Sequence, residues 1–156
     1  WMDIAMDDLK TVLKKVDVLL VNDGEARQLS GEVSLVKAAK AIMAMGPQYL
    51  IIKKGEHGAL LFHQNSVFFA PALPLEDVID PTGAGDTFAG GFTGYLAKVK
   101  DISFDSMKTA IIVGSAMASF CVEKFGPERL KEITADDITA RINEFVQLVN
   151  FDIDLI

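Results

Sequence analysis

The sequence predicts an α/β fold with a mostly parallel sheet flanked by helices on both faces. Two observations support this prediction. Short apolar runs, at residues 17–21 and 49–53, are typical of strands that are buried on both faces. Between them lie segments in which apolar residues recur every three or four positions, as on one face of a helix. Strands that alternate with crossover helices lie parallel to one another in a sheet.

The expected elements follow from these patterns in chain order. Helices are expected at residues 7–15, at 24–29, from a cap at Ser34 to a stop at Gly46-Pro47, from about Asp86, at 104–123 and at 136–149. Strands are expected at residues 17–21, 49–53, 59–62 and 67–70, and the last two form a hairpin around residues 63–65. The chain of 156 residues is half hydrophobic and contains no repeat or linker, so we expect one α/β domain over residues 1–156.

Composition excludes several classes of function. The net charge of −7 argues against a surface for nucleic acid or anionic membrane, because both need clustered Lys and Arg. The single cysteine, Cys121, excludes an internal disulfide framework and is typical of a reducing compartment. The longest apolar run, at residues 109–122, is shorter than the roughly 20 residues that span a bilayer. We therefore expect a cytoplasmic protein with no membrane or nucleic-acid partner.

The most informative segment is Asp80-Pro-Thr-Gly-Ala-Gly-Asp-Thr-Phe88. Gly83 and Gly85 allow a tight turn in which the amides of Gly83, Ala84 and Gly85 point at one anion. A helix that begins near Asp86 adds its free amides and its positive dipole end. The carboxylate of Asp86 would then lie where a transferred phosphate arrives, and a substrate hydroxyl is the plausible donor of a proton to it. The alternative is that Asp86 only caps the helix.

The helix after this segment has two distinct faces. Phe88, Phe92, Tyr95 and Leu96 recur on one face, whereas Gly90, Gly91 and Gly94 thin the other. We expect a neighbouring element to pack closely against the glycine face.

The segment from Asp80 to Phe88 resembles the C-terminal signature of the ribokinase-like, or PfkB-type, carbohydrate and nucleoside kinases. The segments Asn22-Asp-Gly-Glu25 and Lys53-Lys-Gly-Glu-His-Gly58 match the same family in the same order. Members of this family are about twice as long as this chain. The resemblance therefore implies a ribokinase-like fold that lacks its N-terminal half, which supplies further strands, most sugar contacts and a lid.

The resemblance also implies roles for the first two motifs. Asn22 lies near the nucleotide phosphates, and Glu25 helps to hold Mg²⁺, often through water; the alternative is a capping box at the start of a helix. Lys53 contacts phosphate, while Gly55 and Gly58 let the backbone lie against the ribose or base. For Lys53, an ordinary solvated lysine at a strand end is an equal alternative.

Three further residues receive roles from the resemblance alone. Asp80 and the backbone of Thr82 help to bind a monovalent cation, usually K⁺, together with carbonyls near Cys121, Lys124 and Gly126; a turn begun by Asp80-Pro81 is the alternative. Ser115 matches a position that lines the adenine pocket, although the small residues at 114–118 would also allow tight helix packing.

These observations predict ATP-dependent phosphorylation of a hydroxyl group on a sugar or related small molecule, with Asp86 as general base. A nucleoside kinase is one alternative. Another is a non-catalytic nucleotide-binding or assembly module, an inactive half-kinase, since the half that supplies most acceptor contacts in the family is missing. A homodimer of the full-length protein stays an open alternative, because the lid strands that mediate dimers in relatives are absent from this chain.

Overall fold

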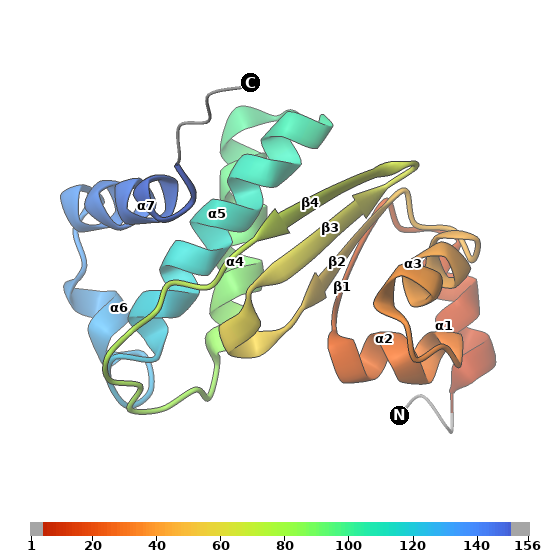
Figure 1. Cartoon of the computed structure of the whole chain (residues 1–156), viewed down its shortest axis with the longest axis horizontal. Coiled ribbons are helices and arrows are strands. Elements are labelled where there is room, and N and C mark those ends of the chain that lie inside the picture. The colour runs from red at the N-terminus through yellow and green to blue at the C-terminus, as the bar shows by residue number, and fades with distance from the viewer. Residues whose placement is uncertain (1–4, 151–156) are drawn as a thin grey trace, which may run out of the picture. The chain divides into compact units, whose positions relative to one another are not determined.

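The computed structural model describes residues 5–150 (Figure 1). The chain divides into two compact units, Trp1–Ala70 and Pro71–Ile156. The first unit contains a sheet and three α-helices, and the second contains four α-helices, among the residues described. The expectation of a single domain over residues 1–156 stays a prediction.

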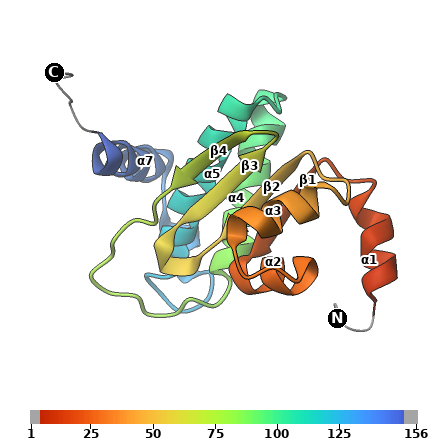
Figure 2. The same ribbon diagram turned by 45° about the vertical axis from the view of Figure 1, so that its right-hand side comes forward.

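The sheet of the first unit has four strands in the order β1-β2-β3-β4 (Figure 2). They are β1 (Val18–Asn22), β2 (Tyr49–Lys53), β3 (Ala59–His63) and β4 (Ser66–Ala70). The α/β class is confirmed, and each strand lies within one residue of its predicted position. Strands β1 and β2 are parallel, with Val18 opposite Tyr49 and Asn22 opposite Lys53.

The expectation of a mostly parallel sheet is wrong for these four strands. Strand β3 is antiparallel to β2, and β4 is antiparallel to β3. The reason is the length of the connections. A parallel neighbour requires a crossover of a dozen or more residues, and only the connection from β1 to β2, which contains two helices, is that long. Residues 54–58 and 64–65 are tight links that reverse the chain.

The helices of the first unit are α1 (Met6–Leu13), α2 (Asp23–Ser30) and α3 (Leu35–Met43). Helices α2 and α3 pack on β1 and β2. A buried cluster formed by the three helices and the sheet contains Leu13, Val21, Ala26, Leu29, Ala39, Ile42, Leu50, Ile52 and Phe62. Ser34 is the N-cap of α3, as predicted, but its side chain makes no capping hydrogen bond. The strand ends that carry the motifs are thereby fixed on a packed layer.

The second unit contains α4 (Ala84–Val99), α5 (Phe104–Cys121), α6 (Glu128–Glu132) and α7 (Ala135–Val149). Helix α6 was not predicted, because five residues of which four are charged carry no recognisable apolar period. The short 3₁₀ turn η1 (Gly55–His57) of the first unit was also not predicted.

Helices α4 and α5 approach each other closely at Gly91 and Gly114. A Cβ built on Gly114 would lie 2.7 Å from the carbonyl oxygen of Phe88, and one on Gly91 would lie 3.1 Å from the Cα of Gly114. The predicted close packing is therefore confirmed at Gly91. It is wrong for Gly90 and Gly94, which face open space with no atom within 4 Å.

The apolar face of α4 is partly as predicted. Phe88 and Phe92 are buried, and their rings stack with centroids 6.3 Å apart. Tyr95 and Leu96 are half-buried. The first turn of α4 is thus anchored by Phe88, two residues after Asp86.

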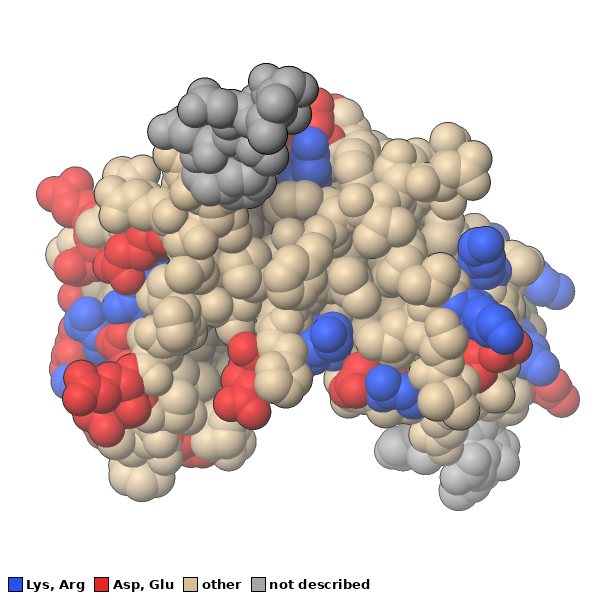
Figure 3. Space-filling view, viewed as in Figure 1, with Lys and Arg blue, Asp and Glu red and all other residues tan. Residues whose placement is uncertain are grey.

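Charged side chains of both signs are intermixed on the face shown in Figure 3, within each of the two units. No helix in residues 5–150 is long and apolar enough to cross a membrane.

Candidate functional site

The glycine loop, Gly83-Ala84-Gly85, forms the N-terminus of α4. Gly83 is the N-cap and has left-handed backbone angles, φ 82° and ψ −3°. An L-residue in this conformation costs roughly 1–2 kcal/mol, so glycine is the favoured residue here. The Ala84 amide donates to the Pro81 carbonyl at 3.2 Å. The amides of Gly83 and Gly85, in contrast, make no hydrogen bond within residues 5–150. They are available to an anion at a positive helix end.

Asp86 is the third residue of α4, and its side chain is exposed. No side chain caps this helix. Among the described residues, the Asp86 carboxylate accepts no hydrogen bond and joins no ion pair. The capping alternative is therefore not seen in the structure, and the carboxylate stands free beside the glycine turn. Its role as general base stays a prediction.

The loop before Gly83 is held by the segment that follows α5. The amides of Ile79 and Asp80 both donate to the carbonyl oxygen of Val122, at 2.8 and 3.3 Å. The thiol of Cys121 donates to the Thr82 carbonyl at 3.7 Å. The end of α5 therefore lies next to Gly83. A Cβ built on Gly83 would be 3.9 Å from the Cys121 sulfur.

Asp80 folds back onto this loop. Its Oδ1 accepts a hydrogen bond from the Thr82 amide at 2.9 Å, which is the predicted turn. Hydrogen bonds from Thr82 and, more weakly, from the Gly126 backbone hold the pKa of the Asp80 carboxyl below its usual value. Asp80, Thr82, Cys121 and Gly126 thus lie together, and their carboxylate and carbonyl oxygens are of the kind that hold K⁺. Cation binding itself stays a prediction.

Asn22 and Glu25 form a capping box at the start of α2. The Asn22 side chain accepts from the Glu25 amide, and the Glu25 carboxylate accepts from the Asn22 amide, both at 2.7 Å. The capping box, which was the alternative interpretation of this motif, is therefore present. It leaves one Glu25 oxygen, Oε1, without a hydrogen bond in the described part of the chain. A single carboxylate suits Mg²⁺, which keeps several waters and takes its remaining ligands from phosphate.

Lys53 ends β2 directly beside Asn22, because the two residues are partners in the parallel register. The following turn is closed by hydrogen bonds from the Lys54 amide to the Gly58 carbonyl (2.8 Å) and from the Gly58 amide to the Gly55 carbonyl (3.1 Å). Gly55 has open space on its side-chain side. A ligand can therefore approach the backbone of this turn closely.

Ser115 is a half-buried residue of α5. Its neighbour Gly114 makes the close contact with α4, so the packing alternative holds for Gly114. The adenine contact of Ser115 stays a prediction.

The predicted residues thus form two groups, one within each unit. In the first unit they lie at the carboxyl ends of β1 and β2 and in the turn that follows: Asn22, Glu25, Lys53, Gly55 and Gly58. In the second unit they lie at the start of α4 and in the loop before it: Asp80, Thr82, Gly83, Ala84, Gly85 and Asp86. No group of three or more His, Cys, Asp or Glu side chains in residues 5–150 is arranged to hold a metal ion.

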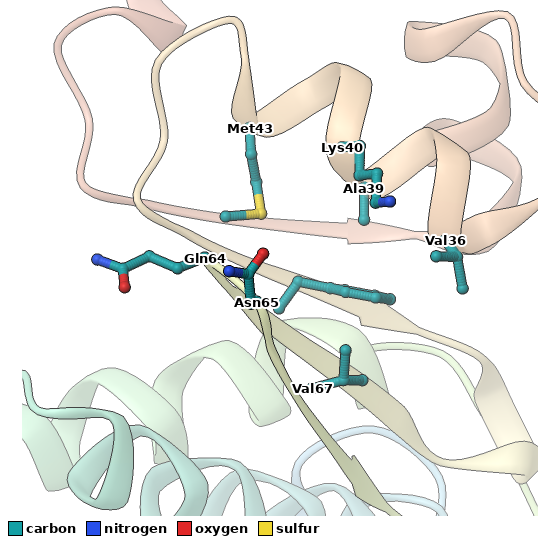
Figure 4. Close-up of a pocket in the computed structure, with 8 residues that line it drawn as sticks. Val36, Ala39, Lys40, Met43, Gln64, Asn65 and Val67 are labelled. Carbon is teal, nitrogen blue, oxygen red and sulfur yellow. The ribbon is translucent and has the colours of Figure 1, made fainter.

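A hollow of about 220 Å³ lies in the first unit, away from these residues. It is bounded by α3 on one side and by the β3–β4 hairpin on the other (Figure 4). Its lining includes Val36, Met43, Phe62 and Val67. None of the predicted site residues contributes to it.

An ionic cluster in the second unit was not predicted from the sequence. Glu123 accepts hydrogen bonds from both Arg129 and Arg141, at 2.9 and 2.6 Å. The partners are 6 and 18 residues apart in the chain and come from three different segments. No spacing rule for a single helix or strand links them, so no signal in the sequence alone identifies the cluster.

Comparison with known proteins establishes the family. A model described as "pfkB family carbohydrate kinase" matches residues 1–133 of the chain. The chain belongs to this family. The resemblance drawn from the three motifs is confirmed.

Two curated members of the family illustrate the relationship. The chain is 37% identical over 92 residues to a cytidine kinase of Thermococcus kodakarensis, a match that covers 57% of this chain and 33% of that protein. It is 31% identical over 122 residues to a ribokinase of Staphylococcus aureus, covering 75% of this chain and 38% of the relative. The chain therefore spans between about a third and two fifths of the length of these relatives.

The solved structures agree. Aminoimidazole riboside kinase from Salmonella enterica, crystallised with aminoimidazole riboside and an ATP analogue, matches with a TM-score of 0.78 at 27% identity. The match covers 90% of this chain and 47% of that one. The ribokinase-like fold is therefore confirmed for the part of the protein present here.

Proposed function

We propose that the protein containing this chain transfers the γ-phosphoryl group of ATP to a hydroxyl group of a sugar or nucleoside. Family membership supports the reaction class. The relatives described above are named for cytidine, ribose and a riboside, which supports a ribose-containing acceptor. The observation that carries the catalytic assignment is the exposed carboxylate of Asp86, which is free of structural hydrogen bonds and one residue after the Gly83–Gly85 turn.

In this mechanism Asp86 accepts the proton of the acceptor hydroxyl as its oxygen attacks phosphorus. The amides of Gly83 and Gly85, and that of Ala84 if it leaves the Pro81 carbonyl, stabilise the charge that develops on the phosphoryl oxygens. They are held in place before the substrate arrives, so the rate gains from electrostatic preorganisation.

We propose nucleotide contacts for the first group of residues and, separately within the second unit, for Ser115. Lys53 supplies a positive charge beside Asn22, and the backbone at Gly55 and Gly58 can lie against the ribose or base. Glu25 would hold Mg²⁺ through water, and the ion when bound neutralises charge on the phosphates. Asp80 and the Thr82 carbonyl would hold K⁺. A cytoplasmic location suits an ATP-dependent enzyme with one buried, unpaired cysteine.

The test is Asp86→Asn in the full-length protein, with Asp136→Asn as the matched control. Asp136 is also an exposed acid in the first turn of a helix, α7, so both changes remove the same favourable interaction with the helix dipole. Asp86→Asn should lower kcat by ~10²- to 10⁴-fold and leave ATP binding intact. Asp136→Asn should leave kcat unchanged. Equal turnover of the two variants in a coupled assay of ADP release would refute the assignment.

A second candidate is a module that binds nucleotide without catalysis. The observation that favours it is the capping box, which gives Asn22 and Glu25 a structural role in place of a role at the phosphates. Calorimetry with Mg-ATP, followed by the coupled assay with a panel of sugars and nucleosides, separates the two candidates. Binding of ATP with no ADP release on any acceptor would favour the module.

A further inference from the structure

The ionic cluster in the second unit ties three segments together. Glu123 directly follows the C-cap of α5, Arg129 lies on α6 and Arg141 on α7. Both carboxylate oxygens of Glu123 are used, because Oε1 accepts from Arg141 at 2.6 Å and Oε2 accepts from Arg129 at 2.9 Å. The three side chains are largely buried, with exposed fractions of 13% for Arg141, 24% for Glu123 and 25% for Arg129.

Arg141 is further fixed by two neighbours on α5. Its Nη1 donates to the hydroxyl of Ser119 at 2.7 Å, and its guanidinium lies 4.0 Å from the centroid of the Phe120 ring. Such a planar cation, bonded on one edge and stacked on one face, has little freedom to move. Arg141 therefore fixes Glu123 relative to the last turn of α5.

Val122, the residue before Glu123, holds the segment that leads into the glycine loop. The Val122 carbonyl is the acceptor for the amides of both Ile79 and Asp80. From Asp80 the loop continues through the Thr82 turn to Gly83, whose left-handed geometry sets the direction of the free amides. A continuous chain of contacts thus runs from Arg141 through Glu123 and Val122 to the N-terminus of α4.

We propose that Glu123 and Arg141 are positioning residues for the phosphate-binding turn, acting through the Val122 carbonyl on the loop at residues 79–83. They touch no reacting atom. This inference rests on the proposed function for its effect on turnover, but its structural part stands on the contacts alone. Because the turn acts on charge that develops in the transition state, misplacing it lowers kcat while leaving KM for the acceptor unchanged.

The experiment compares Glu123→Gln with Glu144→Gln in the full-length protein. Both variants remove one carboxylate near Arg141. The contact of Glu144 is the weaker one, because its side chain is half exposed and its carboxylate lies 3.6 Å from the Arg141 Nε. Hydrogen exchange is measured at the Ile79 and Asp80 amides, with the Phe92 amide in the middle of α4 as an internal reference. Exchange of the first two should rise about tenfold in Glu123→Gln, as expected for the loss of one net hydrogen bond. It should not change in Glu144→Gln or at Phe92.

The kinetic readout follows the same pair. Glu123→Gln should reduce kcat by roughly 10- to 100-fold, the range that small misplacements of a site produce. Equal exchange at Ile79 and Asp80 in the two variants overturns the proposal, and so does a uniform rise that includes Phe92, because that reports general destabilisation. If Glu123→Gln does not fold, Arg141→Lys replaces it and is judged by the same amides, since the single nitrogen of lysine does not reproduce the two guanidinium nitrogens that donate to Ser119 and Glu123.

The two proposals fail in different ways. Retained turnover in Asp86→Asn refutes the catalytic assignment but does not alter amide exchange. If the exchange rates of the Ile79 and Asp80 amides do not change in Glu123→Gln, the positioning role is refuted, whatever Asp86→Asn does to turnover.

Discussion

Replacing Gly114 by alanine should destabilise the second unit. The added Cβ would lie 2.7 Å from the Phe88 carbonyl oxygen and 3.2 Å from the Phe88 ring. A backbone oxygen cannot rotate away, so α4 and α5 must separate. Overpacking of this kind costs about 1–3 kcal/mol, and the better helix propensity of alanine returns about 1 kcal/mol. We expect a net loss of ~1–2 kcal/mol in the free energy of unfolding, taking the upper part of the overpacking range.

Gly90→Ala is the matched control on the facing helix. Gly90 lies inside α4, and no atom would approach its Cβ within 4 Å. The same chemical change therefore brings the helix propensity without the clash and should stabilise the protein by roughly 0.5–1 kcal/mol. Urea denaturation followed by circular dichroism measures both variants. The two midpoints should move in opposite directions.

The functional consequence follows from Phe88, which anchors the first turn of α4. Moving α4 away from α5 at this point displaces Asp86 and the Gly83 turn, so Gly114→Ala should also lower kcat, whereas Gly90→Ala should not. The reasoning is refuted if Gly114→Ala is as stable as the wild type, or if Gly90→Ala is the less stable of the two.

Two further predictions concern capping and pH. Asn22→Ala and Thr134→Ala each remove a capping box, so each should lower the free energy of unfolding by ~1 kcal/mol in urea denaturation. Only Asn22→Ala should weaken ATP binding in calorimetry. An equal loss of ATP affinity in Thr134→Ala would contradict the role of Asn22. Burial opposes ionisation of Glu123, but hydrogen bonds from Arg141 and Arg129 outweigh it and hold the pKa of Glu123 below its usual value of 4.5. The stability that this group contributes is therefore present above pH 4.5 and is lost as the pH falls through the lowered pKa, so the difference in urea midpoint between wild type and Glu123→Gln should shrink on acidification. A difference that stays constant down to about pH 3 would contradict this linkage.

The sequence was sufficient wherever a local pattern had one structural solution. The apolar run from Tyr49 to Ile52 is short and lies between Gly46-Pro47 and Gly55, which favours a buried strand over a helix, and β2 has the predicted bounds. The turn at Gly83 was predictable because its left-handed backbone favours glycine and the following residues form a good helix. The motif at Asn22 allowed two interpretations, and the structure shows the capping box without testing the other.

The remaining features depend on contacts that the local sequence does not specify. The hairpin of β3 and β4 was predicted, but the antiparallel direction of β3 against β2 was not, because it follows from the short link at residues 54–58 rather than from the composition of the strands. Gly91 and Gly90 look equivalent in the sequence, yet only Gly91 faces α5, because the exact azimuth of a helix is decided by packing. The bonds from Arg129 and Arg141 to Glu123 require the placement of α6 and α7, which no motif encodes.

Val122 holds the segment before the glycine loop through its main-chain carbonyl, which accepts from the amides of Ile79 and Asp80. Every amino acid supplies that carbonyl. A comprehensive mutational scan would therefore record position 122 as permissive for any side chain of suitable size, although two amides depend on it. Sensitivity would appear instead at the flanking residues that orient the carbonyl. A map of tolerated substitutions would thus understate the importance of this contact, and only backbone chemistry, such as replacement of an amide by an ester, would expose it directly.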